Sequence, residues 1–157
     1  MNIYASNVGA SKSINELITK VGAYLDNNTL VVGDLNTARS ANDRSSKHNI
    51  SKETRALKDT LDQMDSTDIY RTLHPKATEY TFFSSVHETF SRIDHILGHK
   101  SGLNQYQKIR ILPCIFSDHN ALKLELNHKK KFRKFKHVEV KDHPRKMKGS
   151  TRKLEKN

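Results

Sequence analysis

A short apolar run, TLVVG at residues 29–33, constrains the fold of this chain more than any other feature. Such a run is typical of a β-strand that is buried on both faces. Apolar residues at helical spacing precede it from about Ser11 to Leu25, and Ser11 is a candidate helix cap. A helix that leads into a fully buried strand indicates an α/β fold.

The rest of the chain predicts a mixed sheet. A second helix is expected to begin near Ser51, with Leu57 and Leu61 facing inward, and DIYRTLHP (68–75) adds a helical turn that Pro75 ends. Strand patterns then follow in close succession, at residues 79–83, 91–98, 108–115 and 121–126. Helices are expected between the early strands, while the later strands follow one another directly. This order predicts one mixed α/β sheet with helices on one face and antiparallel strands in its C-terminal part.

The positive charge lies in the last fifth of the chain. Residues 127–157 hold 13 Lys or Arg and 3 Asp or Glu, a net charge of +10, whereas residues 1–126 hold 15 and 14, a net charge of +1. This division predicts a folded domain over residues 1–127 and a disordered basic tail over residues 128–157. The segment KKKFRKFKH (129–137) is typical of DNA or RNA binding and equally of nuclear localisation, and a solvated tail without function stays open.

The cysteine count and the hydropathy pattern indicate the cellular compartment in which the protein is expected. The single cysteine, Cys114, excludes an internal disulfide and a cysteine-based zinc site, and it fits a reducing environment. No apolar stretch approaches the length of a membrane span, and the first residues do not resemble a signal peptide. We therefore expect a soluble intracellular protein, in the nucleus or the cytoplasm, with no membrane partner.

Four polar residues mark the candidate site. Asp34 and Asn36 directly follow the buried strand, and sites in α/β folds form at the carboxyl ends of strands. Asp94 interrupts the apolar pattern of residues 91–98, where a carboxylate needs a partner. His119 is a suitable partner, because a carboxylate fixes the tautomer of an imidazole for acid–base work.

A purely structural role remains an alternative for each of these residues. Aspartate and asparagine after a strand are common in turns, and Asp94 could face solvent on a half-exposed strand. The side-by-side pair Asp118 and His119 could likewise be turn chemistry before the strand at 121–126. His95 and His99 have the spacing of a helical metal pair, but no third ligand stands at a persuasive distance in the sequence.

Several segments together resemble a known superfamily. NIYASN (2–7), VVGDLNTA (31–38), SRIDHI (91–96) and FSDHNAL (116–122) have the order and spacing found in the exonuclease–endonuclease–phosphatase superfamily of metal-dependent enzymes. DIYRTLHPKATEYTFFS (68–84) resembles, more narrowly, the endonuclease domain encoded by the second reading frame of mammalian LINE retrotransposons. The similarity covers about residues 2 to 127, and it favours a site over a turn at Asp118 and His119.

The resemblance implies a role for each catalytic position. Asp34 would orient or activate the attacking water, whereas Asn36 and Tyr4 would contact the scissile phosphate. His119, oriented by Asp94, would stabilise charge on that phosphate.

The resemblance also implies a cofactor and a partner. Asp118 would help to hold the divalent metal, usually Mg²⁺. DNA is the implied partner, and the positions that match DNA-contacting loops are Arg44, Thr81, Ser91, Ile93 and Ser117.

The resemblance begins inside the second half of the superfamily's domain, so we expect a partial two-sheet sandwich. The N-terminal half of that domain supplies an asparagine and the principal metal-binding glutamate, and this sequence contains neither. We therefore expect a weak Mg²⁺ site, a truncated DNA endonuclease of weak or no activity, and an apolar sheet face that a partner or self-association covers. Two alternatives stay open: a non-catalytic nucleic-acid binder acting through the basic tail, and a retroelement-derived product without a selected function.

Overall fold

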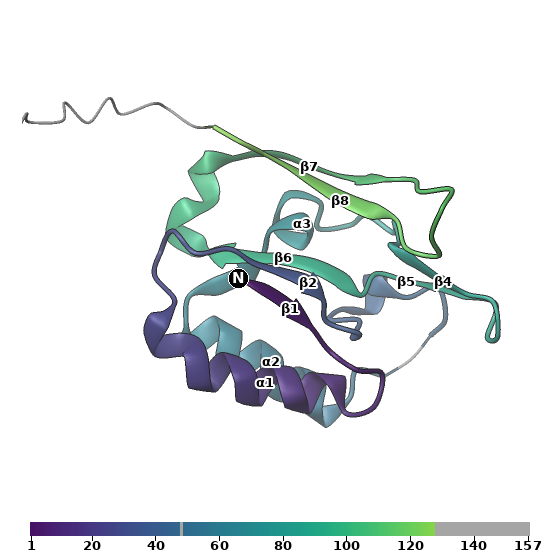
Figure 1. Cartoon of the computed structure of the whole chain (residues 1–157), viewed down its shortest axis with the longest axis horizontal. Coiled ribbons are helices and arrows are strands. Elements are labelled where there is room, and N and C mark those ends of the chain that lie inside the picture. Colours follow the sequence, from purple (N-terminus) through teal and green to yellow (C-terminus); the bar gives the residue numbers. More distant parts are fainter. Residues whose placement is uncertain (48, 128–157) are drawn as a thin grey trace, which may run out of the picture.

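The computed structural model describes residues 1–47 and 49–127, and the predicted basic tail lies outside them. Its helices and strands, labelled in Figure 1, run in the order β1 (Asn2–Tyr4), α1 (Ala10–Val21), β2 (Val31–Asp34), α2 (Lys52–Gln63), β3 (Ser66–Asp68), α3 (Ile69–Leu73), β4 (Phe82–Ser84), β5 (Thr89–Ser91), β6 (Asp94–His99), β7 (Tyr106–Leu112) and β8 (Ala121–Leu126). Short 3₁₀ turns lie at Gly22–Tyr24, Ala41–Asp43 and Lys100–Gln105.

A four-stranded mixed sheet forms the centre, in the order β1-β2-β6-β3. Strands β1 and β2 are parallel, while β6 runs antiparallel to both of its neighbours. The register sets Tyr4 beside Asp34 and Asp34 beside Asp94. Three of the predicted site residues therefore stand in adjacent strands at one end of the sheet.

Helices α1 and α2 lie side by side on one face of this sheet (Figure 1). Ile14, Ile18 and Leu57 are fully buried against sheet residues such as Val31 and Leu97. The helical spacing read from the sequence is confirmed for both helices.

The caps of these two helices differ in how far the sequence predicted them. Helix α2 begins near Ser51 as predicted, and Ser51 caps it, since its hydroxyl accepts a hydrogen bond from the Thr54 N–H at 3.1 Å. Ser11 is not the cap of α1, because Gly9 occupies that position in a left-handed conformation and Ser11 lies buried in the first turn. A hydroxyl partner inside the fold, Thr54, holds Ser11 there instead.

The other face of the sheet is covered, so the predicted exposed apolar face is wrong for the described residues. Helix α3 and the β7–β8 hairpin lie over it (Figure 1), and Ile69, Tyr70 and Ile109 form a buried cluster with Ile96. The structure therefore gives no support to a partner or a second copy on this face.

The strands after α3 also differ from the predicted single sheet. The β4–β5 and β7–β8 ladders are separate two-stranded sheets. In the β7–β8 hairpin, Ile109 stands opposite Leu124 on the inner face, while Arg110 stands opposite Lys123 on the outer face. Because one face is apolar and the other charged, the hairpin packs as a second layer instead of extending the central sheet. In the part of the chain that the structure covers, we find no helix with the length and apolar character of a membrane span.

Candidate active site

The turn after β2 forms the floor of the site. The Asn36 N–H donates to Asp34 Oδ1 at 2.8 Å, and the Asn36 side-chain amide donates to the Ala5 carbonyl at 2.9 Å. Asn36 has a left-handed φ of 47°, which asparagine tolerates better than most residues. Gly33 lets β1 approach closely, since a Cβ there would stand 1.8 Å from the Ile3 carbonyl oxygen. The chain therefore reverses tightly after β2, and these contacts fix Asp34 and Asn36 beside β1.

The Asp94–His119 pair stands opposite this turn and confirms the predicted pairing. Asp94 is the first residue of β6 and not a mid-strand residue, because β5 ends at Ser91 and Arg92 and Ile93 lie between the two strands. His119 Nδ1 lies 2.8 Å from Asp94 Oδ2. A carboxylate only accepts, so Nδ1 carries the proton and Nε2 is left for a ligand.

The loop between β7 and β8 holds His119 in place. The His119 N–H donates to Ser117 Oγ at 3.0 Å, and the imidazole packs on the Phe82 ring with 4.8 Å between centroids. His119 also forms an isolated β-bridge with Phe82. The β4–β5 hairpin and the β7–β8 loop therefore share the task of presenting this imidazole.

Asp34, Asp94 and His119 converge. Each offers a ligand atom, and these atoms all lie within 4.8 Å of one another. Burial raises the pKa of Asp34 above its ordinary value of 3.8, and the neighbouring charge of Asp94 adds to this, although the Asn36 N–H opposes it. Two carboxylates and an imidazole at this spacing can handle protons or bind a cation.

A cleft of about 700 Å³ opens over these groups. It brings together most of the predicted residues, namely Tyr4, Asp34, Asn36, Arg44, Ser91, Ile93, Asp118 and His119. Tyr4 is 77% exposed at its rim, and Ser117 is exposed on the adjoining loop. Asp94 stands behind His119 and reaches the cleft through it.

Thr81 does not present its side chain to the cleft as the resemblance implies. It is fully buried, and its hydroxyl accepts hydrogen bonds from the N–H groups of Ile93 and Asp94 at 3.1 and 3.2 Å. Thr81 therefore holds the start of β6 and lies too deep to touch a ligand in this structure.

The oxygen donors of the cleft suit a hard divalent cation. Mg²⁺ is commonly held in proteins by one or two carboxylates, with waters and substrate phosphates completing the shell. Asp34 and Asp118 supply two carboxylates to the same cleft, and Asp118 is the more exposed of the two. The donor chemistry of the described residues thus fits Mg²⁺, with few protein ligands.

A buried ionic network beneath the site was missed in the sequence. Arg92, fully buried, pairs with Asp43 at 2.9 Å and with Asp68 at 2.8 Å. Asp43 lies in the polar stretch 36–49, which has no hydrophobic periodicity, so the sequence did not indicate that Asp43 is buried. Arg92 lies within the apolar strand predicted at residues 91–98. A charged residue in that strand was the sequence signal that could have indicated a buried ion pair.

The alternative metal pair His95 and His99 does not form. His95 is buried and contacts Asp68 and the Thr37 carbonyl, whereas His99 pairs with Ser101 near the surface. The rise along β6 explains why: residues four apart on a strand lie about 13 Å apart, whereas one turn of a helix brings them to about 6 Å.

Comparison with known proteins gives a consistent family. The sequence profile of the endonuclease/exonuclease/phosphatase family matches residues 7–119. An uncharacterized 149 kDa protein of transposon TX1 from Xenopus laevis is 26% identical over 136 residues, which are 81% of this chain and 10% of that protein.

Solved structures show the same fold. An AP endonuclease from Archaeoglobus fulgidus has a TM-score of 0.65 at 16% identity, over 81% of this chain and 60% of that one. The endonuclease domain of TRAS1, a telomere-specific non-LTR retrotransposon, has a TM-score of 0.63 at 16% identity, over 82% of this chain and 56% of that one. This chain spans little more than half of those structures. The predicted fold class and the resemblance to retrotransposon endonucleases are confirmed, and the chain belongs to the endonuclease/exonuclease/phosphatase family.

Proposed function

We propose that the chain carries the catalytic residues of a DNA endonuclease that hydrolyses a phosphodiester bond with the help of a divalent metal. The Asp94–His119 pair, at 2.8 Å and facing Asp34 across one cleft, is the observation that carries this proposal. DNA-processing relatives, among them the AP endonuclease and the TRAS1 domain, support a nucleic-acid substrate.

Asp34 is the residue that accepts the proton of the attacking water. Its raised pKa reflects partial burial, and it makes Asp34 a better base than an exposed aspartate. The water oxygen bonds to phosphorus, the bond from phosphorus to one deoxyribose oxygen breaks, and that oxygen takes a proton from solvent.

The opposite wall of the cleft stabilises the charge on the phosphate. His119 Nε2 points away from Asp94, and when the ring is doubly protonated it can donate to a phosphate oxygen while Nδ1 donates to Asp94. The Asn36 amide has a second N–H beyond the one it gives to Ala5, and Tyr4 offers a hydroxyl at the rim.

Asp118 would help to hold Mg²⁺. The cation would supply neutralisation of the negative charge that grows on the phosphate oxygens. Because so few carboxylates line the cleft, we expect a high requirement for Mg²⁺ and low activity.

A plasmid-nicking assay tests the proposal. Purified protein should convert supercoiled plasmid to open circles only with Mg²⁺, and the His119→Ala variant should lose this conversion. Nicking that survives His119→Ala would point to a contaminating nuclease. Soluble, folded protein that binds DNA without nicking it would favour a non-catalytic binder that uses the basic residues 128–157.

A further inference from the structure

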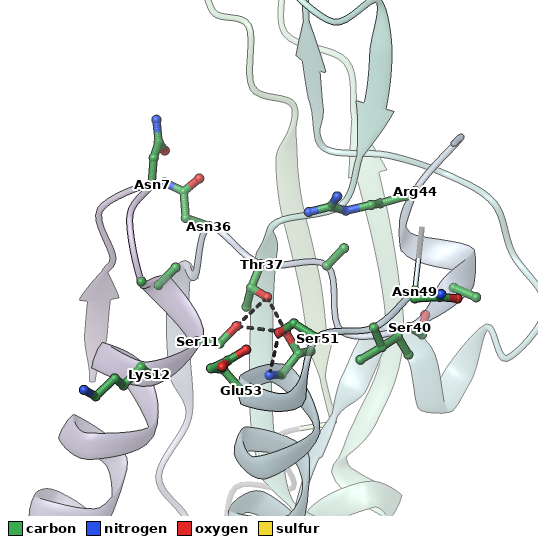
Figure 2. Close-up of a pocket in the computed structure, with 16 residues that line it drawn as sticks. Asn7, Ser11, Lys12, Asn36, Thr37, Ser40, Arg44, Asn49, Ser51 and Glu53 are labelled. Atoms are coloured by element: carbon green, nitrogen blue, oxygen red, sulfur yellow. Dashed lines mark hydrogen bonds between the residues drawn. The ribbon is translucent and has the colours of Figure 1, made fainter. Parts of the chain in front are cut away.

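Thr37, the residue after Asn36, is clamped from two sides. Its hydroxyl lies 2.9 Å from Ser11 Oγ and 3.3 Å from Thr54 Oγ1, so it is hydrogen-bonded to the first turns of both α1 and α2. Figure 2 shows this hydroxyl directed toward Ser11, with Asn36 on the turn that leads into Thr37. From the opposite side, His95 Nε2 lies 2.9 Å from the Thr37 carbonyl oxygen.

His95 is itself fixed by the buried ionic network. Its Nδ1 lies 2.8 Å from Asp68 Oδ2, and Arg92 Nη2 lies 2.8 Å from the same oxygen. His95 is 1% exposed and Arg92 is 0% exposed. Because charges this deep are costly unless paired, the ring has one well-defined orientation.

The direction of the His95 contact to the turn is set by its partner. A backbone carbonyl can only accept, so Nε2 carries a proton and His95 donates to Thr37. His95 is absent from the lining of the catalytic cleft, although its neighbours Ile93 and Asp94 reach the site. The hydrogen bond by which His95 contacts the site therefore runs to the turn that bears Asn36, beside the through-space effect of its charge on Asp34.

That turn needs support. Asn36 adopts a left-handed conformation that is sparsely populated for residues other than glycine, and such a conformation persists when its surroundings hold it. The Asn36 N–H also gives Asp34 its closest hydrogen bond. A shift of Thr37 would move both the Asn36 amide and the Asp34 carboxylate.

We propose that His95, oriented by Asp68, is a positioning residue that holds the Asp34–Asn36 turn in its reactive geometry. This inference rests on the proposed function for its catalytic consequence, but the geometry of the turn can be measured without activity. It predicts that losing the hydrogen bond to the Thr37 carbonyl loosens the turn while the rest of the fold remains.

Two substitutions of His95 separate its two contacts. In His95→Gln the amide nitrogen reaches about as far as Nε2 and keeps a donor for the Thr37 carbonyl. In His95→Asn the shorter amide serves only the Asp68 side. The first readout is the hydrogen-exchange rate of the Asn36 amide, divided by that of the Ile18 amide in the core of α1.

In His95→Asn this ratio should rise about 10-fold or more, and the cleavage rate constant should fall roughly 10- to 100-fold with an unchanged KM. In His95→Gln both should stay within about threefold of the parent chain. Leu57→Ala, at a fully buried position of α2, is the control for lost stability: it should not raise the ratio, because it speeds exchange of the Ile18 amide, and it should leave KM unchanged.

Equal losses in the Gln and Asn variants, or an unchanged exchange ratio in His95→Asn, would overturn the inference. If the parent chain binds Mg²⁺ and DNA without cleaving, the proposed function fails. The exchange ratio then still decides whether His95 positions the turn.

Discussion

Among single residues, Asp94 shows how one carboxylate sets the chemistry of its neighbour. Asp94→Asn can offer its NH₂ group to His119 Nδ1 and so favour the tautomer whose proton is missing from Nδ1. We expect single-turnover cleavage to fall about 10²- to 10⁴-fold with unchanged DNA affinity. Asp59→Asn, an exposed position of α2, is the matched control. An Asp94→Asn variant that cleaves at the parent rate would show that the pair is only structural.

Asp34 is predicted to lower stability in exchange for reactivity. Its folded pKa is raised above 3.8, mainly by burial, so the folded state binds the proton more tightly than the unfolded state does. The charged carboxylate therefore opposes folding above the folded pKa, and this penalty disappears as the pH falls toward 3.8.

Asp34→Asn should consequently raise Tm at pH 7 by roughly 1–4 °C, leave Tm unchanged at pH 3, and abolish cleavage. The substituted amide can still accept the Asn36 N–H, so the turn is kept. Thermal unfolding followed by circular dichroism at both pH values measures this, and a lower Tm at pH 7 would contradict the assignment.

At the scale of elements, the ionic network joins the 3₁₀ turn Ala41–Asp43, the start of α3 and the entry to β6. Burial alone would raise the pKa values of Asp43 and Asp68, but Arg92 and His95 outweigh it and lower both. For carboxyls with lowered pKa values, the stabilisation is present above the ordinary value of 3.8 and is lost as the pH falls through the folded pKa.

Arg92→Met should lower the free energy of unfolding at pH 7 by about 3–5 kcal/mol, because two buried carboxylates lose their cation. The difference from the parent chain should shrink as the pH falls below 3.8, because the two carboxylates that lack their cation in the variant become protonated there. Urea unfolding at pH 7 and pH 3 gives both values. A difference that does not depend on pH would mean that lost packing, and not lost charge, weakens the variant.

Elements with a regular pattern could be predicted from the sequence, and those defined by packing could not. Alternation along residues 121–126 matches β8, and Ser51 marks the start of α2. The division of later strands into three sheets depends on which faces meet across the fold, which local alternation does not record. The site shows the same limit: Asp94 and His119 were predictable as partners, whereas buried Thr81 and Asp43 depend on distant contacts.

For the whole molecule, the uneven charge predicts how DNA affinity responds to salt. Of the net charge of +11, residues 127–157 contribute +10. Each phosphate contact that releases a counterion adds about 0.9 to the slope of log affinity against log salt. Deleting residues 128–157 should therefore flatten this slope by several units. Fluorescence anisotropy between about 50 and 200 mM salt measures it, and an unchanged slope would place the phosphate contacts on the cleft.

The site also depends on the packing of two layers, because Asp34 and Asp94 lie on the central sheet while His119 lies in the loop that joins β7 and β8. Ile109 of β7 is fully buried in the cluster with α3, whereas Ile18 of α1 is fully buried on the opposite face of the central sheet. Ile109→Ala and Ile18→Ala should each cost about 2–5 kcal/mol of unfolding free energy. They remove the same atoms from opposite sides of the sheet.

Only Ile109→Ala should also separate His119 from Asp94, since it loosens the layer that carries the imidazole. At a temperature where both variants are fully folded, its single-turnover cleavage should fall at least about 10-fold below that of Ile18→Ala, as expected when a catalytic group is displaced by about 1 Å. Urea unfolding confirms matched stability. Equal cleavage by the two variants would show that the hairpin loop is held by its own contacts, Ser117 and Phe82, and that the layers contribute stability alone.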